Sequence, residues 1–101
     1  MHPVRDAVSP ALASVLRRQP LSPGKVAFAW RVAVGLPMAR ATHPRLTETG
    51  ALVVEAAGEH WARETVRSVP QILPRLEALL GPEVVRRVEV RAKALERQPR
   101  P

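Results

Sequence analysis

Two kinds of hydrophobic periodicity follow each other in the middle of the chain. From residue 51 to 57 apolar and polar positions alternate, which is typical of a strand with Leu52 and Val54 on its covered side. A helical pattern begins at Glu59 and places apolar residues three and four positions apart. Pro70 interrupts this pattern, and a second apolar stripe continues to Gly81. We therefore expect one strand followed by two helices. The first of these helices carries Trp61, Ala62, Val66 and Val69, and the second carries Ile72, Leu73, Leu76, Leu79 and Leu80.

The N-terminal third predicts two further helices. Each begins with Ser-Pro, in which serine is the N-cap and proline takes the first helical position, at Ser9 and at Ser22. Gln19-Pro20 ends the first helix, and Gly35 with the following Pro37 ends the second. The expected apolar side of the first helix is Leu12, Val15 and Leu16. That of the second is Val26, Trp30, Ala33 and Val34, with Phe28 and Val32 indicating burial on more than one side.

Two more strands complete the predicted sheet. Residues 43–47 form the first, and Pro44 favours an edge position because proline lacks the N–H that a central strand needs. Residues 48–50 make a hairpin turn, and residues 83–91 alternate again, with Val84, Val88 and Val90 on one side. The fold class is therefore α+β, with helices covering one face of a three-stranded sheet. The other, open face should carry Arg45, Thr47, Val53, Glu55, Arg87, Glu89 and Arg91.

Length and composition bound the possible functions. The chain has 101 residues, of which 46% are hydrophobic, and this suits one domain. We expect that domain to span residues 1–93, followed by a short polar tail at 94–101. The absence of cysteine excludes disulfides, thiolate metal sites and cysteine nucleophiles. No apolar run approaches the roughly 18 residues of a membrane span, and the start lacks the core of a signal peptide. These features predict a cytoplasmic protein without a membrane partner.

The charge balance indicates a polyanionic partner. Sixteen basic residues face nine acidic ones, for a net charge of +7, and nearly all the bases are arginine. The candidate phosphate-binding residues are Arg86, Arg87, Arg91 and Lys93, followed by Arg45 and Arg40. They converge if the first and last strands lie near each other. Two alternatives stay open: the arginines serve only solubility, or they reflect the codon bias of the genome.

Catalytic and metal-binding patterns are weak. The serines at positions 9 and 22 are explained as helix caps, and no serine has a histidine placed to activate it. His60 and Glu64 share a helix face, yet no third ligand is apparent, and first-turn acids are favourable at a helix N-terminus anyway. We expect no enzymatic activity, no metal and no cofactor. Trp30 and Trp61 both fall on apolar stripes, so we expect them in the core rather than stacked on bases.

The order of several motifs resembles one family. The motifs are Trp30-x-x-x-Val34-Gly35, His43-Pro44, Gly50-x-Leu52-x-Val54, Trp61-Ala62-x-Glu64 and Leu73-x-x-Leu76 before Leu80-Gly81 and an arginine-rich strand. Together they resemble the DciA family of bacterial replicative-helicase loaders. The resemblance implies a fold similar to a type II KH domain, αββααβ with an extra N-terminal helix. It also implies a non-catalytic adaptor that binds the hexameric replicative helicase and single-stranded DNA.

The resemblance leaves two other functions open. A KH domain grips nucleic acid with a GxxG loop between two helices, whereas this chain has SVPQ at residues 68–71. A KH-like module that binds RNA is one alternative. A domain that binds only protein, with arginines for solubility, is the other.

Overall fold

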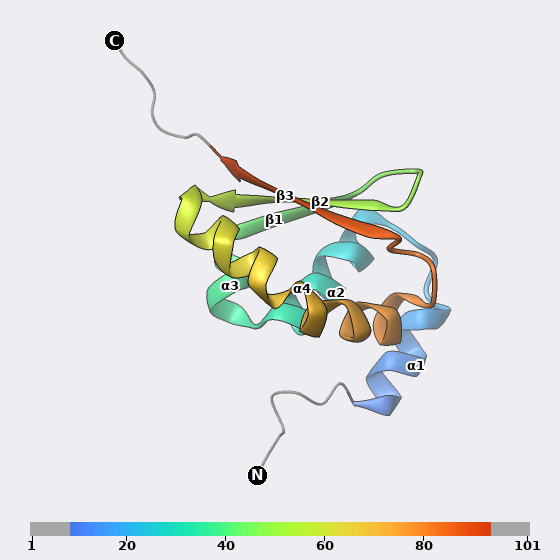
Figure 1. Cartoon of the computed structure of the whole chain (residues 1–101). Coiled ribbons are helices and arrows are strands. Elements are labelled where there is room, and N and C mark those ends of the chain that lie inside the picture. Colours follow the sequence, from blue (N-terminus) through green and yellow to red (C-terminus); the bar gives the residue numbers. More distant parts are fainter. Residues whose placement is uncertain (1–8, 94–101) are drawn as a thin grey trace.

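The computed structural model describes residues 9–93, in which a three-stranded sheet lies over a layer of helices (Figure 1). The elements in chain order are α1 (Pro10–Arg18), α2 (Pro23–Val34), α3 (Leu36–Arg40), β1 (Thr42–Leu46), β2 (Ala51–Ala57), α4 (Gly58–Leu80) and β3 (Arg87–Lys93). The predicted α+β class, with helices on one face of the sheet, is confirmed. The KH likeness stays an expectation. The predicted tail at 94–101 lies outside the described residues.

The central strand of the sheet is β2. The strand order is β1-β2-β3, with β1 antiparallel and β3 parallel to β2. Pro44 therefore lies on an edge strand, as expected. The arginines of the first and last strands were expected to converge if these two strands lay near each other. Strands β1 and β3 are not neighbours, however, because β2 lies between them. The strand registers place Arg45, Arg87 and Arg91 on one face of the sheet instead.

The serine caps form as the sequence predicts. The hydroxyl oxygen of Ser9 accepts a hydrogen bond from the backbone N–H of Leu12 at 3.4 Å, and that of Ser22 accepts one from Lys25 at 3.0 Å. Helix α2 ends at Gly35, whose φ of 86° suits glycine. The short helix α3 starts immediately afterwards and was not predicted. Pro37 stops α2 but fits the first turn of the next helix, where no N–H is needed.

Helix α4 is one continuous helix, so the prediction of two helices between residues 59 and 80 is wrong. It contains Pro70 and Pro74, both of which are exposed. Each proline leaves the carbonyl four residues earlier without its helical partner. On an exposed side of the helix, water can hydrate these carbonyls. Burial of Ile72, Leu76 and Leu79 on the opposite side holds the helix together across both prolines.

The two tryptophans differ in burial. Trp30 is 1% exposed, and its indole Nε1 donates to the hydroxyl of Thr42 at 2.8 Å, so its placement in the core is confirmed. Trp61 is only half-buried, with its ring edge-on to His60 at a centroid distance of 5.5 Å. Trp61 is therefore less buried than the expected core position requires.

The buried stripe of α4 passes through Thr65 rather than Val66. Val66 is 57% exposed, whereas Thr65 is fully buried and its hydroxyl donates to the carbonyl of Trp61 at 2.7 Å. That internal hydrogen bond satisfies the polar atom and allows threonine to occupy a core position. Two other expected core residues, Val15 and Phe28, are also exposed. The guanidinium carbon of Arg31 lies over the ring of Phe28, 5.9 Å from its centroid, in a cation–π contact.

The last strand begins later than its alternating pattern indicates. Residues 83–86 form a turn and loop in which Glu83 has a positive φ of 67°, and β3 starts at Arg87. Alternation with Val84 would put Val85 on the open side of a strand, but Val85 is buried in the core because it lies in this loop instead. The alternation is correct only from Arg87 onward.

Candidate nucleic-acid interface

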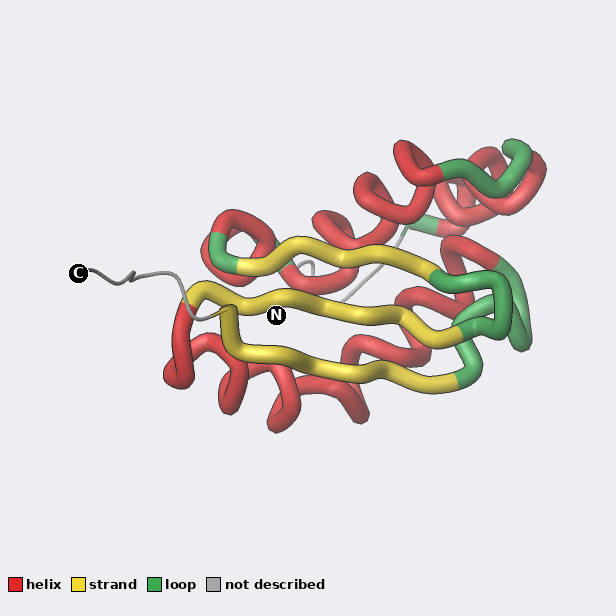
Figure 2. Tube along the Cα trace, turned by 90° about the horizontal axis from the view of Figure 1, so that it is seen from above, coloured by secondary structure: helices red, strands yellow, loops and turns green. Residues whose placement is uncertain are grey.

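The open face of the sheet carries the charged residues that the strand alternation predicts. Leu52 and Val54 of β2 are fully buried against the helices, while His43 and Arg45 of β1 are exposed on the other side. No helix passes over the strands in the view from above (Figure 2). The residues of this open face are His43, Arg45, Ala51, Val53, Glu55, Ala57, Arg87, Glu89, Arg91 and Lys93.

Strand register arranges these side chains in rows across the sheet. Arg45 and Glu89 lie on either side of Val53, and His43 and Arg91 lie on either side of Glu55. Val53 was expected on this face and is there, yet it is only 4% exposed. The longer neighbouring side chains account for its burial, since aliphatic stems of charged residues cover apolar surface.

Glu89 lies between two arginines of its own strand. One carboxylate oxygen accepts a hydrogen bond from Nε of Arg87 at 3.0 Å, and the other is 3.6 Å from Nη2 of Arg91. Both pairs are exposed to solvent and contribute little to stability. The carboxylate of Glu89 matters for electrostatics instead. Its negative charge reduces the positive potential with which Arg87 and Arg91 would attract phosphate.

A depression lies at the end of the sheet where β2 leads into α4. It has a volume of about 480 Å³, and its lining includes Arg40, His43, Glu55 and Lys93. Arg40, at the end of α3, is thereby brought to the same place as Lys93 at the end of β3. The depression continues the open face, since His43, Glu55 and Lys93 belong to both.

Arg86 is separate from the other five predicted residues. It precedes β3 at the hairpin end of the sheet, where its backbone N–H donates to the carbonyl of Gly50 at 2.7 Å. Its aliphatic stem lies against Gly50, because a Cβ on that glycine would be 2.8 Å from Cγ of Arg86. The structure thus places Arg45, Arg87, Arg91 and Lys93 on the open face and Arg40 beside it.

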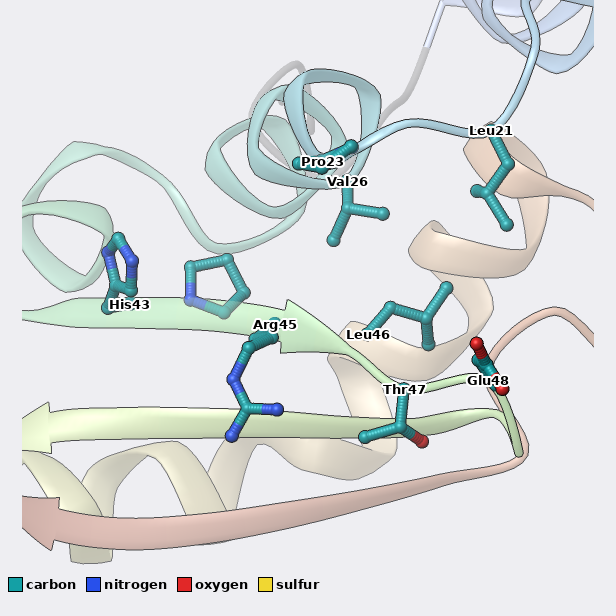
Figure 3. A pocket seen from close by; sticks show the side chains of 9 residues that line it. Leu21, Pro23, Val26, His43, Arg45, Leu46, Thr47 and Glu48 are labelled. Carbon is teal, nitrogen blue, oxygen red and sulfur yellow. The ribbon is translucent and has the colours of Figure 1, made fainter.

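A groove along the outer edge of β1 was not predicted from the sequence. Its volume is about 430 Å³, and in Figure 3 Leu21 and Val26 point toward Leu46 from the α1–α2 loop and α2. Leu21 is 54% exposed although it is a large apolar residue. It lies between two prolines and outside any periodic stripe, so no pattern marked it. The lining of the groove is Leu21, Pro23, Val26, His43, Pro44, Arg45, Leu46, Thr47 and Glu48.

Residues 9–93 contain neither a metal-binding cluster nor a membrane-spanning helix. In this range no three histidine, aspartate or glutamate side chains are grouped so as to hold a metal ion. None of the helices there has the length and apolar character needed to cross a bilayer. The pair His60 and Glu64 therefore stays without a third ligand in the described part of the chain.

Comparison with known protein families places the chain in one of them. No curated protein matches the sequence. The sequence model of the family described as "Dna[CI] antecedent, DciA" matches residues 3–90, which is most of the chain and includes every element up to the middle of β3. The chain belongs to the DciA family.

Proposed function

We propose that this protein is a non-catalytic adaptor that binds the hexameric replicative helicase and contacts single-stranded DNA through the open face of its sheet. Membership of the DciA family, a family of helicase loaders, supports a role in DNA replication. The two contacts themselves are the proposal, and different features support them.

The charge of the open face is the observation that carries the DNA contact. Its strands present Arg45, Arg87, Arg91 and Lys93 against only two carboxylates, and Arg40 lies in the adjoining depression. Cations on this face would neutralise phosphates and release counterions, which gives affinity without sequence preference.

The same face lacks a large aromatic ring for stacking bases. The one phenylalanine and both tryptophans of the chain are on helices, and the aromatic ring on this face is the small imidazole of His43. Binding through phosphates alone should therefore depend strongly on salt and weakly on base identity.

The continuity of α4 favours this reading over a KH-type grip on RNA. A KH domain holds four nucleotides with a GxxG loop between two helices. Residues 68–71 are here part of an unbroken helix, so they offer no loop at that place. Nucleic-acid contact through the sheet does not need such a loop.

Co-elution tests the proposed function directly. The purified chain is mixed with the replicative helicase of the same organism and run on a sizing column, with and without a single-stranded oligonucleotide. We expect a chain–helicase complex in both cases and a ternary complex when DNA is present. In parallel, affinities for single-stranded DNA and a structured RNA are compared at equal salt. Failure to co-elute with the helicase, or a clear preference for the RNA, would contradict the proposal.

A further inference from the structure

The depression at the end of the sheet has basic side chains without partners in the described part of the chain. Arg40, His43 and Lys93 line it, and within residues 9–93 their side chains form no hydrogen bond or ion pair. The two arginines of β3, in contrast, share the carboxylate of Glu89. An anion that enters the depression therefore displaces no existing ion pair there, and its binding meets less competition than it does on β3.

Three strands and one helix bring the polar groups of the depression to a hollow of about 480 Å³. Arg40 ends α3, His43 lies on β1, Glu55 lies on β2, and Lys93 ends β3. Thr42 also lines the hollow, but its hydroxyl already accepts one hydrogen bond at 2.8 Å and donates another at 2.6 Å. The side-chain groups left for a ligand are two cations, one imidazole and one carboxylate.

A second hollow, between α4 and β3, provides a comparison. It has a volume of about 400 Å³, and its lining includes Arg63, Arg67, Val66 and Val90. Arg67 is 3.3 Å from the carboxylate of Glu64. An anion in this hollow would lie against valines and compete with that carboxylate for one of the two cations. The two hollows therefore have similar volumes and equal numbers of full cations, but they differ in how available those cations are.

The charges in the depression favour one kind of anion. Arg40 and Lys93 exceed the carboxylate of Glu55 by a single positive charge when the imidazole of His43 is counted as neutral. A phosphodiester carries one negative charge, whereas a terminal or free phosphate carries close to two at neutral pH. Glu55 repels the second of these charges, and no further cation of the hollow balances it. The balance therefore suits a phosphodiester of a nucleic-acid backbone.

The position of the depression suits a strand that runs lengthwise along the sheet. Arg87, Arg91 and Lys93 follow one another on β3, and the distance from the first to the last is about 20 Å at the usual rise of a strand. A single strand of DNA beside β3 would pass the two arginines and reach the depression between Lys93 and Arg40. Phosphate contacts of this kind fix the register of a nucleic acid on a protein.

We propose that the depression is a phosphate-binding subsite in which Arg40 and Lys93 hold one phosphodiester of a single DNA strand, with His43 beside it and Glu55 disfavouring phosphates of higher charge. The proposal rests on the proposed function, in which single-stranded DNA lies on the open face. It adds an anchor point for the strand, the residues that form it and the charge of the phosphate that it takes. A strand end and a free phosphate offer the same oxygen atoms, and their higher charge separates them from a phosphodiester in the test.

Two pairs of exposed cations make a matched test. Arg40→Gln/Lys93→Gln removes both full cations from the depression, and Arg63→Gln/Arg67→Gln makes the same change in net charge at the second hollow. All four side chains are exposed, so both variants should stay folded, and circular dichroism checks this. Fluorescence anisotropy gives the affinity of each variant and of the unchanged chain for a single-stranded oligonucleotide without terminal phosphates.

Nuclear magnetic resonance locates the subsite without DNA. Dimethyl phosphate, a phosphodiester without sugar or base, is titrated into the unchanged chain. The backbone amides of Ala41 and Ala57 report on the depression, and that of Val90 reports on the second hollow. We expect saturable shifts at Ala41 and Ala57 but not at Val90, and their loss in Arg40→Gln/Lys93→Gln.

We expect Arg40→Gln/Lys93→Gln to weaken DNA binding at least about tenfold, because it removes two charge-assisted contacts, whereas Arg63→Gln/Arg67→Gln should change it by less than about threefold. Glu55→Gln gives a second readout. It should raise the affinity for inorganic phosphate more than that for dimethyl phosphate, because the lost repulsion acts on a larger charge. A terminal phosphate on the oligonucleotide should change the affinity of the unchanged chain by less than about twofold.

The outcomes separate the two proposals. If the unchanged chain does not bind single-stranded DNA, the proposed function fails in its DNA contact. If it binds DNA but Arg40→Gln/Lys93→Gln binds equally well, or if both double variants lose affinity to the same extent, the depression is not a phosphate subsite. The same follows if dimethyl phosphate shifts the amides of both hollows alike or of neither. A larger gain from a terminal phosphate, or equal gains for both phosphates in Glu55→Gln, overturns the assignment to a phosphodiester.

Discussion

The guanidinium of Arg87 donates a hydrogen bond from Nε to the carboxylate of Glu89 at 3.0 Å, on the open face of the sheet. The same carboxylate is 3.6 Å from Arg91 on its other side. One acidic residue thus holds two of the cations that we assign to phosphate binding. Glu89 competes with phosphate for both of them.

Glu89→Gln should therefore raise the affinity for single-stranded DNA. Each exposed pair is worth about 0.2–1 kcal/mol, so freeing both arginines, about 0.4–2 kcal/mol together, predicts a gain of about two- to thirtyfold. Stability should change little for the same reason. Fluorescence anisotropy with a labelled oligonucleotide measures the effect. Glu77→Gln, on the exposed side of α4, makes the same change in net charge and should give a smaller gain. Equal gains in the two variants would mean that only the net charge matters.

Gly50 should not tolerate a side chain. Its φ is 89°, and an added Cβ would lie 2.8 Å from Cγ of Arg86. Gly50→Ala should lower the free energy of unfolding by about 1–3 kcal/mol, as measured by urea denaturation. Gly24 in α2 is the matched control, because a Cβ there would lie 3.9 Å from the hydroxyl oxygen of Ser22, an ordinary van der Waals contact. Gly24→Ala should be neutral or stabilising by up to about 1 kcal/mol. A Gly50→Ala variant as stable as the unchanged chain would refute this account of the hairpin.

Lys25 stabilises the end of α1 rather than contributing to the basic surface. It is buried, and its ammonium group donates to the carbonyl of Gln19 at 2.6 Å and to that of Arg17 at 3.4 Å. Lys25→Met keeps the aliphatic stem but removes these bonds, and it should cost about 1–2 kcal/mol of unfolding free energy. The exposed Arg18, in the last turn of the same helix, is the control: Arg18→Met should cost less than about 1 kcal/mol. If the two costs are equal, Lys25 acts only through its charge near the helix end.

Local chemistry made much of the fold predictable from the sequence. Ser9 and Ser22 cap helices through their own hydroxyls, and Gly35 and Gly50 adopt the positive φ that their positions suggested. Pro44 lies on an edge strand for the reason expected of proline. These features depend on residues within a few positions of each other, and such signals are visible in a single sequence.

The failures arise where tertiary packing decides. Pro70 and Pro74 suggest a break, yet the burial of residues on the other side of α4 keeps that helix continuous. Thr65 has a polar side chain but is buried, because its hydroxyl donates a hydrogen bond to the carbonyl of Trp61 in the same helix. Burial of this kind depends on neighbours that are distant in the sequence.

The sequence predicted which residues the candidate site contains better than it predicted how they are arranged. Alternation along β1 and β3 placed Arg45, Arg87 and Arg91 on one face. It could not show that β2 separates them, because strand order depends on the path of α4 beneath the sheet. Nor could it show that Arg86 lies against the hairpin, since the turn before β3 sets that contact.

The salt dependence of DNA binding tests most directly whether the open face contacts phosphates. The double variant Arg87→Gln/Arg91→Gln removes two cations from that face, and Arg18→Gln/Arg31→Gln removes two exposed cations from α1 and α2. Affinity for a single-stranded oligonucleotide is measured over a range of salt concentrations. If the open face binds the backbone, the first variant lowers the log–log slope by roughly 1.4, or about 0.7 per lost contact, and the second leaves it near that of the unchanged chain. An unchanged slope in Arg87→Gln/Arg91→Gln, or an equal fall in both variants, would contradict the account.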